Sequence, residues 1–141
     1  MMREVYLQPG ELYCGAGVVR VTTLLGSCVA ITLWHPGRQV GAMCHYMLPT
    51  RSKTAHAAWD GRYADEALAM FRRELSTRNL SPREFQVGVF GGGNMFPNAP
   101  PSHLDVGARN ALAARILLPK HGFGTDWEDV GGVGELVDRA Q

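Results

Sequence analysis

The stretch TTLLGSCVAITLWHPGRQVGAMCHYMLP, Thr22 to Pro49, decides the fold because it predicts two adjacent β-strands. β-branched and aromatic residues, which favour strands, fill the segment from Cys28 to Trp34. The turn sequence HPGR follows, and a second largely apolar segment extends from Gln39 to Leu48. These signals predict an antiparallel hairpin that turns at Pro36–Gly37.

The hairpin is expected to bring one cysteine and one histidine together. A turn at the proline–glycine pair, or a loop of residues 35–38, pairs Cys28 with His45. Directly paired residues point to one face of a sheet, with their Cβ atoms about 4.5–5.5 Å apart. Neighbours along a strand point to opposite faces, so we expect Cys44 to be a core thiol on the other face. A single bulge would move His45 to that other face as well.

A thiol beside an imidazole is the arrangement that nucleophilic catalysis requires. An imidazolium stabilises the thiolate of Cys28, and the imidazole of His45 later carries a proton to the leaving group. Such a base needs a third group to orient it, and Thr22 and Thr23 supply hydroxyls from the preceding strand. The glycine–serine pair before Cys28 allows a sharp turn that points its N–H at an oxyanion. On spacing alone, the alternative that both residues belong to the core stays open.

Two helices are predicted outside the hairpin. Asp60 is the expected N-cap of the first helix and Asn79 marks its end, while the second helix begins near Asp105 and Pro119 stops or kinks it. Helical spacing predicts the inward-facing residues, which are Ala64, Leu68, Phe71 and Leu75 in the first helix and Ala108, Ala111, Leu112 and Ile116 in the second.

Further short strands are expected at residues 5–8, 15–26, 85–90 and 125–130. Strands with interspersed helices predict one α/β or α+β domain over residues 1–141. The glycine-rich segment Gly91–Asn94 follows one of these strands directly. It is either a tight structural loop or a nest of N–H groups for an anion, and it lacks the lysine of a phosphate-binding loop.

Composition excludes several classes of function. Lysine and arginine number 14 against 13 aspartates and glutamates, so bulk charge predicts no binding to nucleic acid and no membrane insertion. The chain contains three cysteines, too few and too irregular for a disulfide framework, and no apolar run has the length of a membrane span or a signal peptide. We therefore expect a reduced, cytoplasmic protein. Two ligands and no C-x-x-C motif predict no metal site, and the remaining histidines are expected at the surface: His35, His56, His103 and His121.

The sequence resembles the CheD family of chemoreceptor glutamine deamidases. The similarity runs from Val5 to Gly132. The motifs that carry it are TLLGSCVAITLWHP, GAMCHYMLP, YADEALAMF, GGGNMF, VGARNALAARILL and EDVGG. The first two are the specific ones when they occur together, and the glycine-rich motifs add support.

The resemblance implies a layered domain with a mixed, mostly antiparallel β core and two main helices, similar to the catalytic domain of cytotoxic necrotising factor toxins. It implies a protein-glutamine glutaminase that deamidates selected glutamines of methyl-accepting chemotaxis receptors, without a cofactor. Some family members are also linked to hydrolysis of receptor methyl esters. Carried over onto this sequence, the nucleophile is Cys28, the base is His45 and the orienting threonine is Thr22. The resemblance also implies a second kind of partner, a CheC-type phosphatase.

Two features depart from the family pattern. Pro119 interrupts the end of the second helix, and the tail GGVGELVDRAQ lacks the asparagine, aromatic and arginine that usually follow the late glycine pair. The alternative to an enzyme is therefore a binding module that docks a receptor or a CheC-type phosphatase with little catalysis of its own.

Overall fold

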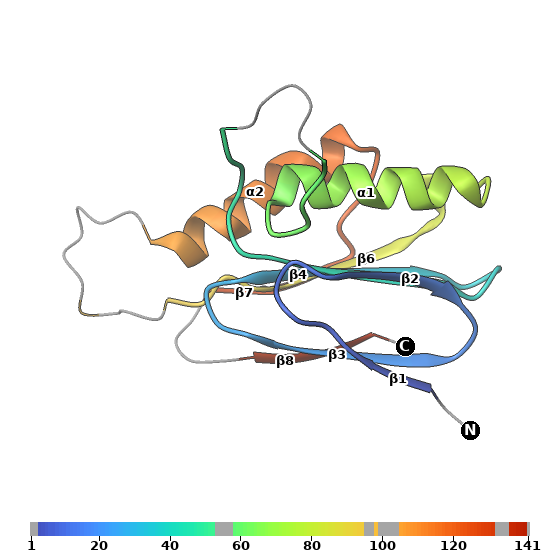
Figure 1. The fold of residues 1–141 in the computed structure, drawn as a ribbon, viewed down its shortest axis with the longest axis horizontal. Coiled ribbons are helices and arrows are strands. Elements are labelled where there is room, and N and C mark those ends of the chain that lie inside the picture. Colours follow the sequence, from blue (N-terminus) through green and yellow to red (C-terminus); the bar gives the residue numbers. More distant parts are fainter. Residues whose placement is uncertain (1–2, 53–57, 95–97, 99–104, 132–135, 141) are drawn as a thin grey trace.

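The structure is a computed structural model that describes residues 3–52, 58–94, 98, 105–131 and 136–140. It has three layers: two helices, a five-stranded sheet and a three-stranded sheet (Figure 1). The five-stranded sheet lies in the middle, with the helices on one face and the smaller sheet on the other. The expected mixed, mostly antiparallel β core with two main helices is confirmed.

The central sheet has the strand order β2-β5-β4-β6-β7. Its pairs are antiparallel except for β6 and β7, which are parallel. Its strands are β2 (Leu12–Ala16), β4 (Val29–His35), β5 (Val40–Tyr46), β6 (Gln86–Gly91) and β7 (Trp127–Val130).

The smaller sheet has the order β1-β3-β8, and it combines segments from both ends of the sequence. Its strands are β1 (Arg3–Tyr6), β3 (Val19–Leu25) and β8 (Leu136–Ala140). Strand β3 pairs in parallel with β1 and antiparallel with β8. The pattern of the sequence did not predict β8, which lies in the departing tail.

The hairpin of β4 and β5 is present, but its predicted register is wrong by two residues. Ala30, not Cys28, lies opposite His45. The loop covers residues 36–39, and Gln39 has a φ of 52°, a conformation that few residues other than glycine adopt. Because the shift is an even number of residues, Cys28 and His45 remain on the same face of the sheet.

The first helix agrees with its predicted stripe. Helix α1 (Ala64–Thr77) buries Ala64, Leu68, Phe71 and Leu75. Asn79 follows the helix with a φ of 56°, as its predicted role at the C-terminal end requires. The N-cap is Tyr63 rather than Asp60, whose carboxylate forms an ion pair with Arg62 instead.

The second helix packs with a different face from the one predicted. Helix α2 (Val106–Lys120) begins after its predicted N-cap Asp105 and ends one residue beyond Pro119. Ala111 is buried as expected, but Ala108, Leu112 and Ile116 are exposed. The buried residues are mostly small: Gly107, Asn110, Ala111, Ala113, Ala114 and Leu118. Small side chains bring the helix close to the sheet, and this close approach outweighs the burial of two larger apolar residues.

Two hydrophobic cores fill the spaces between the three layers. One lies between the helices and the central sheet, and Cys44 is fully buried within it. The other lies between the two sheets around Leu25, Ala30 and Met43, with Cys28 packed against its edge. The alternation along β4 and β5 therefore sends Cys44 toward the helices and His45 toward the smaller sheet. The predicted separation of Cys44 from His45 is confirmed.

Candidate active site

His45 lies between the two sheets and is only 2% exposed. Strand β5 carries it, and Thr23 of strand β3 approaches it from the opposite sheet, with 2.7 Å between the Thr23 Oγ1 and His45 Nδ1 atoms. The backbone carbonyl of His45 accepts a hydrogen bond from the N–H of Gly10 at 2.7 Å. The ring and its backbone are thus both fixed by neighbouring segments.

The hydrogen bonds of Thr23 determine which ring nitrogen of His45 carries the proton. The Thr23 hydroxyl lies 2.8 Å from the carbonyl oxygen of Leu7, which can only accept, so the single hydroxyl hydrogen goes there. The hydroxyl oxygen then accepts from His45, and Nδ1 must carry a hydrogen. In the neutral ring this leaves Nε2 with a free lone pair, and Nε2 has no hydrogen-bond partner among the described residues.

Burial shifts both Cys28 and His45 toward their neutral forms. Desolvation lowers the pKa of His45 below its ordinary value, and it raises the pKa of the Cys28 thiol. An imidazolium–thiolate pair in the resting protein, as expected from the sequence, is therefore disfavoured. The pKa directions favour a neutral thiol with a neutral imidazole, in which the base takes the thiol proton as the attack occurs.

Cys28 lies one residue before β4, at its entrance, and is half-buried. It is two residues from Ala30, the direct partner of His45, so Cys28 and His45 are diagonal neighbours on one face. Diagonal neighbours lie about 7–8 Å apart between backbones, within reach of long and aromatic side chains. Cys28 and His45 thus lie on the same face, but the direct pairing is wrong and, among the described residues, no hydrogen bond reaches Nε2 of His45 from the Cys28 thiol.

The glycine-rich segment after β6 holds the backbone of the cysteine loop. The N–H of Gly92 donates to the Cys28 carbonyl at 2.8 Å, and the N–H of Gly93 donates to the Gly26 carbonyl at 2.9 Å. Gly91 has a φ of 105°, and a Cβ on it would collide with the Cys28 carbonyl oxygen. The N–H groups of Gly92 and Gly93 therefore bond protein carbonyls, which favours the tight structural loop over an anion site.

The other two cysteines belong to different surroundings. Cys44 is fully buried, and desolvation raises its pKa to about 12, so its thiol is inert at neutral pH. Cys14 packs beside the same helix-facing core, and burial raises its pKa as well. Cys28 is thus the one cysteine that shares a face with His45.

Thr23, and not the expected Thr22, is the threonine that contacts His45. Thr22 is next to it on β3 and points to the opposite face of the smaller sheet.

If His45 takes part in catalysis, replacing Thr23 by valine is expected to lower the turnover rate about ten- to a hundredfold, because the imidazole loses its fixed orientation. The change also leaves the Nδ1–H of His45 and the carbonyl of Leu7 unpaired in the interior, at a cost of about 1–3 kcal/mol of stability for each group. Thr22→Val is the matched control, with activity close to that of the parent protein. Activity assays and thermal melts measure both effects. An activity loss confined to Thr22→Val would restore the original prediction.

Two positions near the site escaped the sequence prediction. Leu7 contributes only its carbonyl, which no side-chain pattern reveals. Asn110 of α2 is fully buried, and its side-chain amide donates to the carbonyls of Ser27 and Met47. A detectable signal existed for Asn110, since it shares a helical stripe with Gly107, Ala111 and Ala114.

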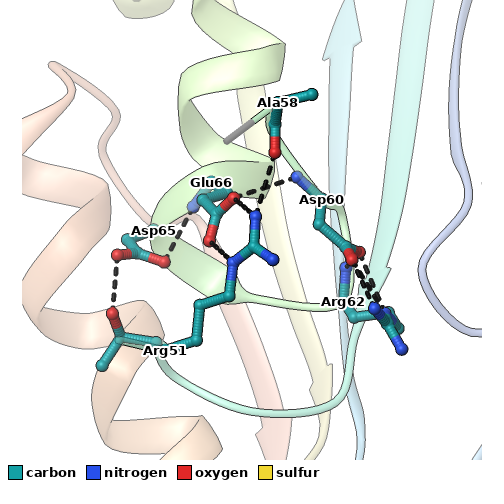
Figure 2. A network of polar contacts seen from close by, with 7 residues as sticks. Arg51, Ala58, Asp60, Arg62, Asp65 and Glu66 are labelled. Carbon is teal, nitrogen blue, oxygen red and sulfur yellow. Dashed lines mark hydrogen bonds and ion pairs between the residues drawn. The ribbon is translucent and has the colours of Figure 1, made fainter. Parts of the chain in front are cut away.

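An ion-pair network anchors the segment that follows β5 (Figure 2). Arg51 donates to both carboxylate oxygens of Glu66, which is 2% exposed, and the N–H of Asp60 donates to the same carboxylate. Asp60 also pairs with Arg62, whose backbone carbonyl accepts from the N–H groups of Met47 and Leu48. The end of the strand that carries His45 is therefore tied to the start of α1.

The remaining histidines lie away from this region or outside the described residues. His35 was expected at the surface but is only 8% exposed, and its Nε2 pairs with Glu84 at 2.9 Å. His121 follows α2 and is partly exposed. His56 and His103 lie outside the described residues.

The described residues hold no cluster of metal-ligand side chains and no helix fit to cross a membrane. Within those ranges no three histidine, cysteine, aspartate or glutamate side chains gather as metal ligands would. Likewise, none of the described helices combines the length and the apolar character needed to cross a membrane.

A thiol and an imidazole on one face, with a hydroxyl bonded to the imidazole, are the kinds of group that thiol-dependent hydrolases use. The family model described as CheD chemotactic sensory transduction matches residues 47–135. The chain is 43% identical over 133 residues to the probable chemoreceptor glutamine deamidase CheD 3 of Dechloromonas aromatica, strain RCB, covering 94% of this chain and 78% of that protein. It is 44% identical to the probable chemoreceptor glutamine deamidase CheD of Pseudomonas syringae pv. tomato, over 93% of this chain and 79% of that protein. The chain therefore belongs to the CheD family.

Similarity to solved structures is weaker. The hypothetical protein YfiH of Bacillus licheniformis aligns with a TM-score of 0.48 and 12% identity, over 82% of this chain and 46% of that one. YlmD from Geobacillus stearothermophilus aligns with a TM-score of 0.43 and 15% identity, over 80% of this chain and 47% of that one.

Proposed function

We propose that this protein hydrolyses the side-chain amide of selected glutamines on methyl-accepting chemotaxis receptors, giving glutamate and ammonia. Membership of the CheD family and the names of its relatives support the substrate. Receptor glutamines would be reached on the cytoplasmic helical region, and we accordingly place the protein in the cytoplasm.

One observation carries the chemistry. His45 is held at Nδ1 by Thr23 while its Nε2 has no partner among the described residues, and Cys28 lies on the same face. A base fixed at one nitrogen and free at the other is ready to accept a proton from a nearby thiol. We assign Cys28 as nucleophile, His45 as base and Thr23 as the residue that orients the base.

The first half-reaction releases ammonia. Nε2 of His45 takes the proton from the Cys28 thiol as the sulfur attacks the carboxamide carbon of the glutamine. The new carbon–sulfur bond moves the carbonyl electron pair onto oxygen, and the N–H of Cys28 is the donor we assign to this oxyanion. When the oxyanion collapses, the carbon–nitrogen bond breaks, His45 gives its proton to the leaving nitrogen, and a thioester remains.

The second half-reaction restores the enzyme. Nε2 of His45 takes a proton from water as the water oxygen attacks the thioester carbon. The carbon–sulfur bond then breaks, the sulfur recovers the proton from His45, and the product is a glutamate side chain. The thiol, the imidazole and the backbone donor perform every step, so the mechanism needs no cofactor.

The direct test incubates the protein with a purified receptor cytoplasmic domain and follows glutamine-containing peptides by mass spectrometry. We expect conversion of specific glutamines to glutamate, together with one ammonia released for each site converted. A receptor domain left unchanged while it forms a stable complex with this protein would instead support the binding-module alternative.

A further inference from the structure

We propose that Asn110 is a positioning residue that sets the separation of Cys28 and His45. Its amide nitrogen donates to the carbonyl of Ser27 at 3.0 Å and to the carbonyl of Met47 at 2.8 Å. Ser27 directly precedes Cys28, and Met47 is two residues beyond His45. The inference rests on the proposed function, since it concerns the geometry of the same two reactive groups.

Asn110 joins β4 and β5 at the point where their own ladder stops. The last pair of that ladder is Val29 with Tyr46. Just beyond it, the chain before β4 leads to the smaller sheet, and the chain after β5 enters the segment that leads to α1. Ser27 and Met47, whose carbonyls Asn110 binds, lie on these two diverging segments. The amide therefore links the two segments just beyond the last pair of the β4–β5 ladder.

The amide of Asn110 supplies the donors that both carbonyls need. A primary amide nitrogen carries two hydrogens, one for each acceptor, whereas a carboxylate has none to donate. Both acceptors are carbonyl oxygens, so the nitrogen of Asn110 must face them. The amide oxygen is then buried with no hydrogen-bond partner among the described residues. An apolar side chain at this position would leave the carbonyls of Ser27 and Met47 without this donor, so the amide is kept despite its own unpaired oxygen.

Independent contacts fix the part of α2 that carries Asn110. The hydroxyl of Tyr46 donates to the backbone carbonyl of Asn110 at 2.6 Å. One turn earlier, Gly107 lies against the carbonyls of Gly92 and Gly93, where a Cβ would collide with the backbone. The helix start therefore contacts the glycine loop that holds Cys28, and the amide links that loop to the strand of the base.

The test compares Asn110→Ala, Asn110→Asp and Asn110→Ser with Leu118→Val, a control that loses buried volume at the far end of the same helix. Two readouts are needed: kcat and KM for receptor deamidation, and the pH dependence of Cys28 alkylation by iodoacetamide, followed by peptide mass spectrometry. The alkylation readout uses no receptor, so it reports on Asn110 even if the proposed substrate is wrong.

We expect Asn110→Ala and Asn110→Asp to lower kcat about a hundredfold with KM changed less than about threefold, because a displacement of about 1 Å has effects of this size. The alkylation profile of Cys28 should shift with them. Asn110→Ser, which can donate to one carbonyl, should be intermediate, and Leu118→Val should lower the melting temperature with kcat near that of the parent. Asn110 variants with parental kcat and a parental alkylation profile would overturn the inference, as would an equal loss of kcat in Leu118→Val.

Discussion

Cys28→Ala is expected to abolish deamidation of a receptor domain while the protein remains folded. In the proposed mechanism the thiol forms the covalent intermediate, and its removal leaves no thiol on the face that His45 occupies, since Cys14 and Cys44 pack on the other face. Cys28 is half-buried at the edge of the inter-sheet core, so the loss of one sulfur atom there should change the melting temperature little. Ammonia release, peptide mass spectrometry and a thermal melt check the three parts of this expectation.

The other cysteines provide the controls. Cys14→Ala and Cys44→Ala should retain activity, and Cys44→Ala should also lower the melting temperature because that thiol fills part of a fully buried core. If Cys28→Ala kept the activity of the parent protein, Cys28 could not be the nucleophile, whatever the results for Cys14→Ala and Cys44→Ala.

His45→Ala is expected to lower the single-turnover rate of ammonia release by about 10²–10⁴-fold, the usual contribution of a general acid–base group. His45→Asn is the sharper variant, since an amide can still meet the Thr23 hydroxyl while nothing replaces Nε2. Both variants should show similar losses. A loss of less than about tenfold in either one would mean that another group moves the proton.

The same base predicts the pH dependence of the reaction. His45 must be neutral to accept a proton, so the rate should rise as the pH increases through the pKa of His45. Because burial lowers that pKa, the midpoint of the acid limb should lie below the ordinary value of 6.5. The parent protein, assayed at constant ionic strength, provides the measurement. A midpoint at or above 6.5 would contradict the neutral pair and favour a resting imidazolium.

The sequence predicted the hairpin and the faces of its residues because both follow from local patterns. β-branched residues and a proline–glycine turn define the two strands, and the pleat separates Cys44 from His45 whatever the exact register. The register depends on the conformation of the loop. Gln39 adopts a positive φ there, which could not be predicted because glutamine rarely does so. An even slip preserved the site, whereas a slip of one residue would have destroyed it.

Tertiary contacts decided the features that local patterns missed. Thr22 and Thr23 are equivalent in type, and only the second sheet determines which one faces His45. The apolar residues Leu112 and Ile116 have the spacing of a buried helix face, but they are exposed. The face with the small residues Gly107 and Ala114 packs on the sheet instead, because it allows a closer approach of α2. The residues of β8 have no clear alternation of apolar and polar side chains. This segment is a strand because it pairs with β3.

The order of strands in the smaller sheet has a consequence for the synthesis of the protein. Strand β3, which carries Thr23, lies between β1 near the start of the described chain and β8 near its other end. Residues 21–25 cannot complete their pairing until the ribosome has released residues 136–140. Contacts this distant along the chain form slowly, and until they form β3 keeps an open edge that can pair with other chains. A nascent chain therefore cannot complete the sheet that carries Thr23, the contact of His45, before β8 has been made.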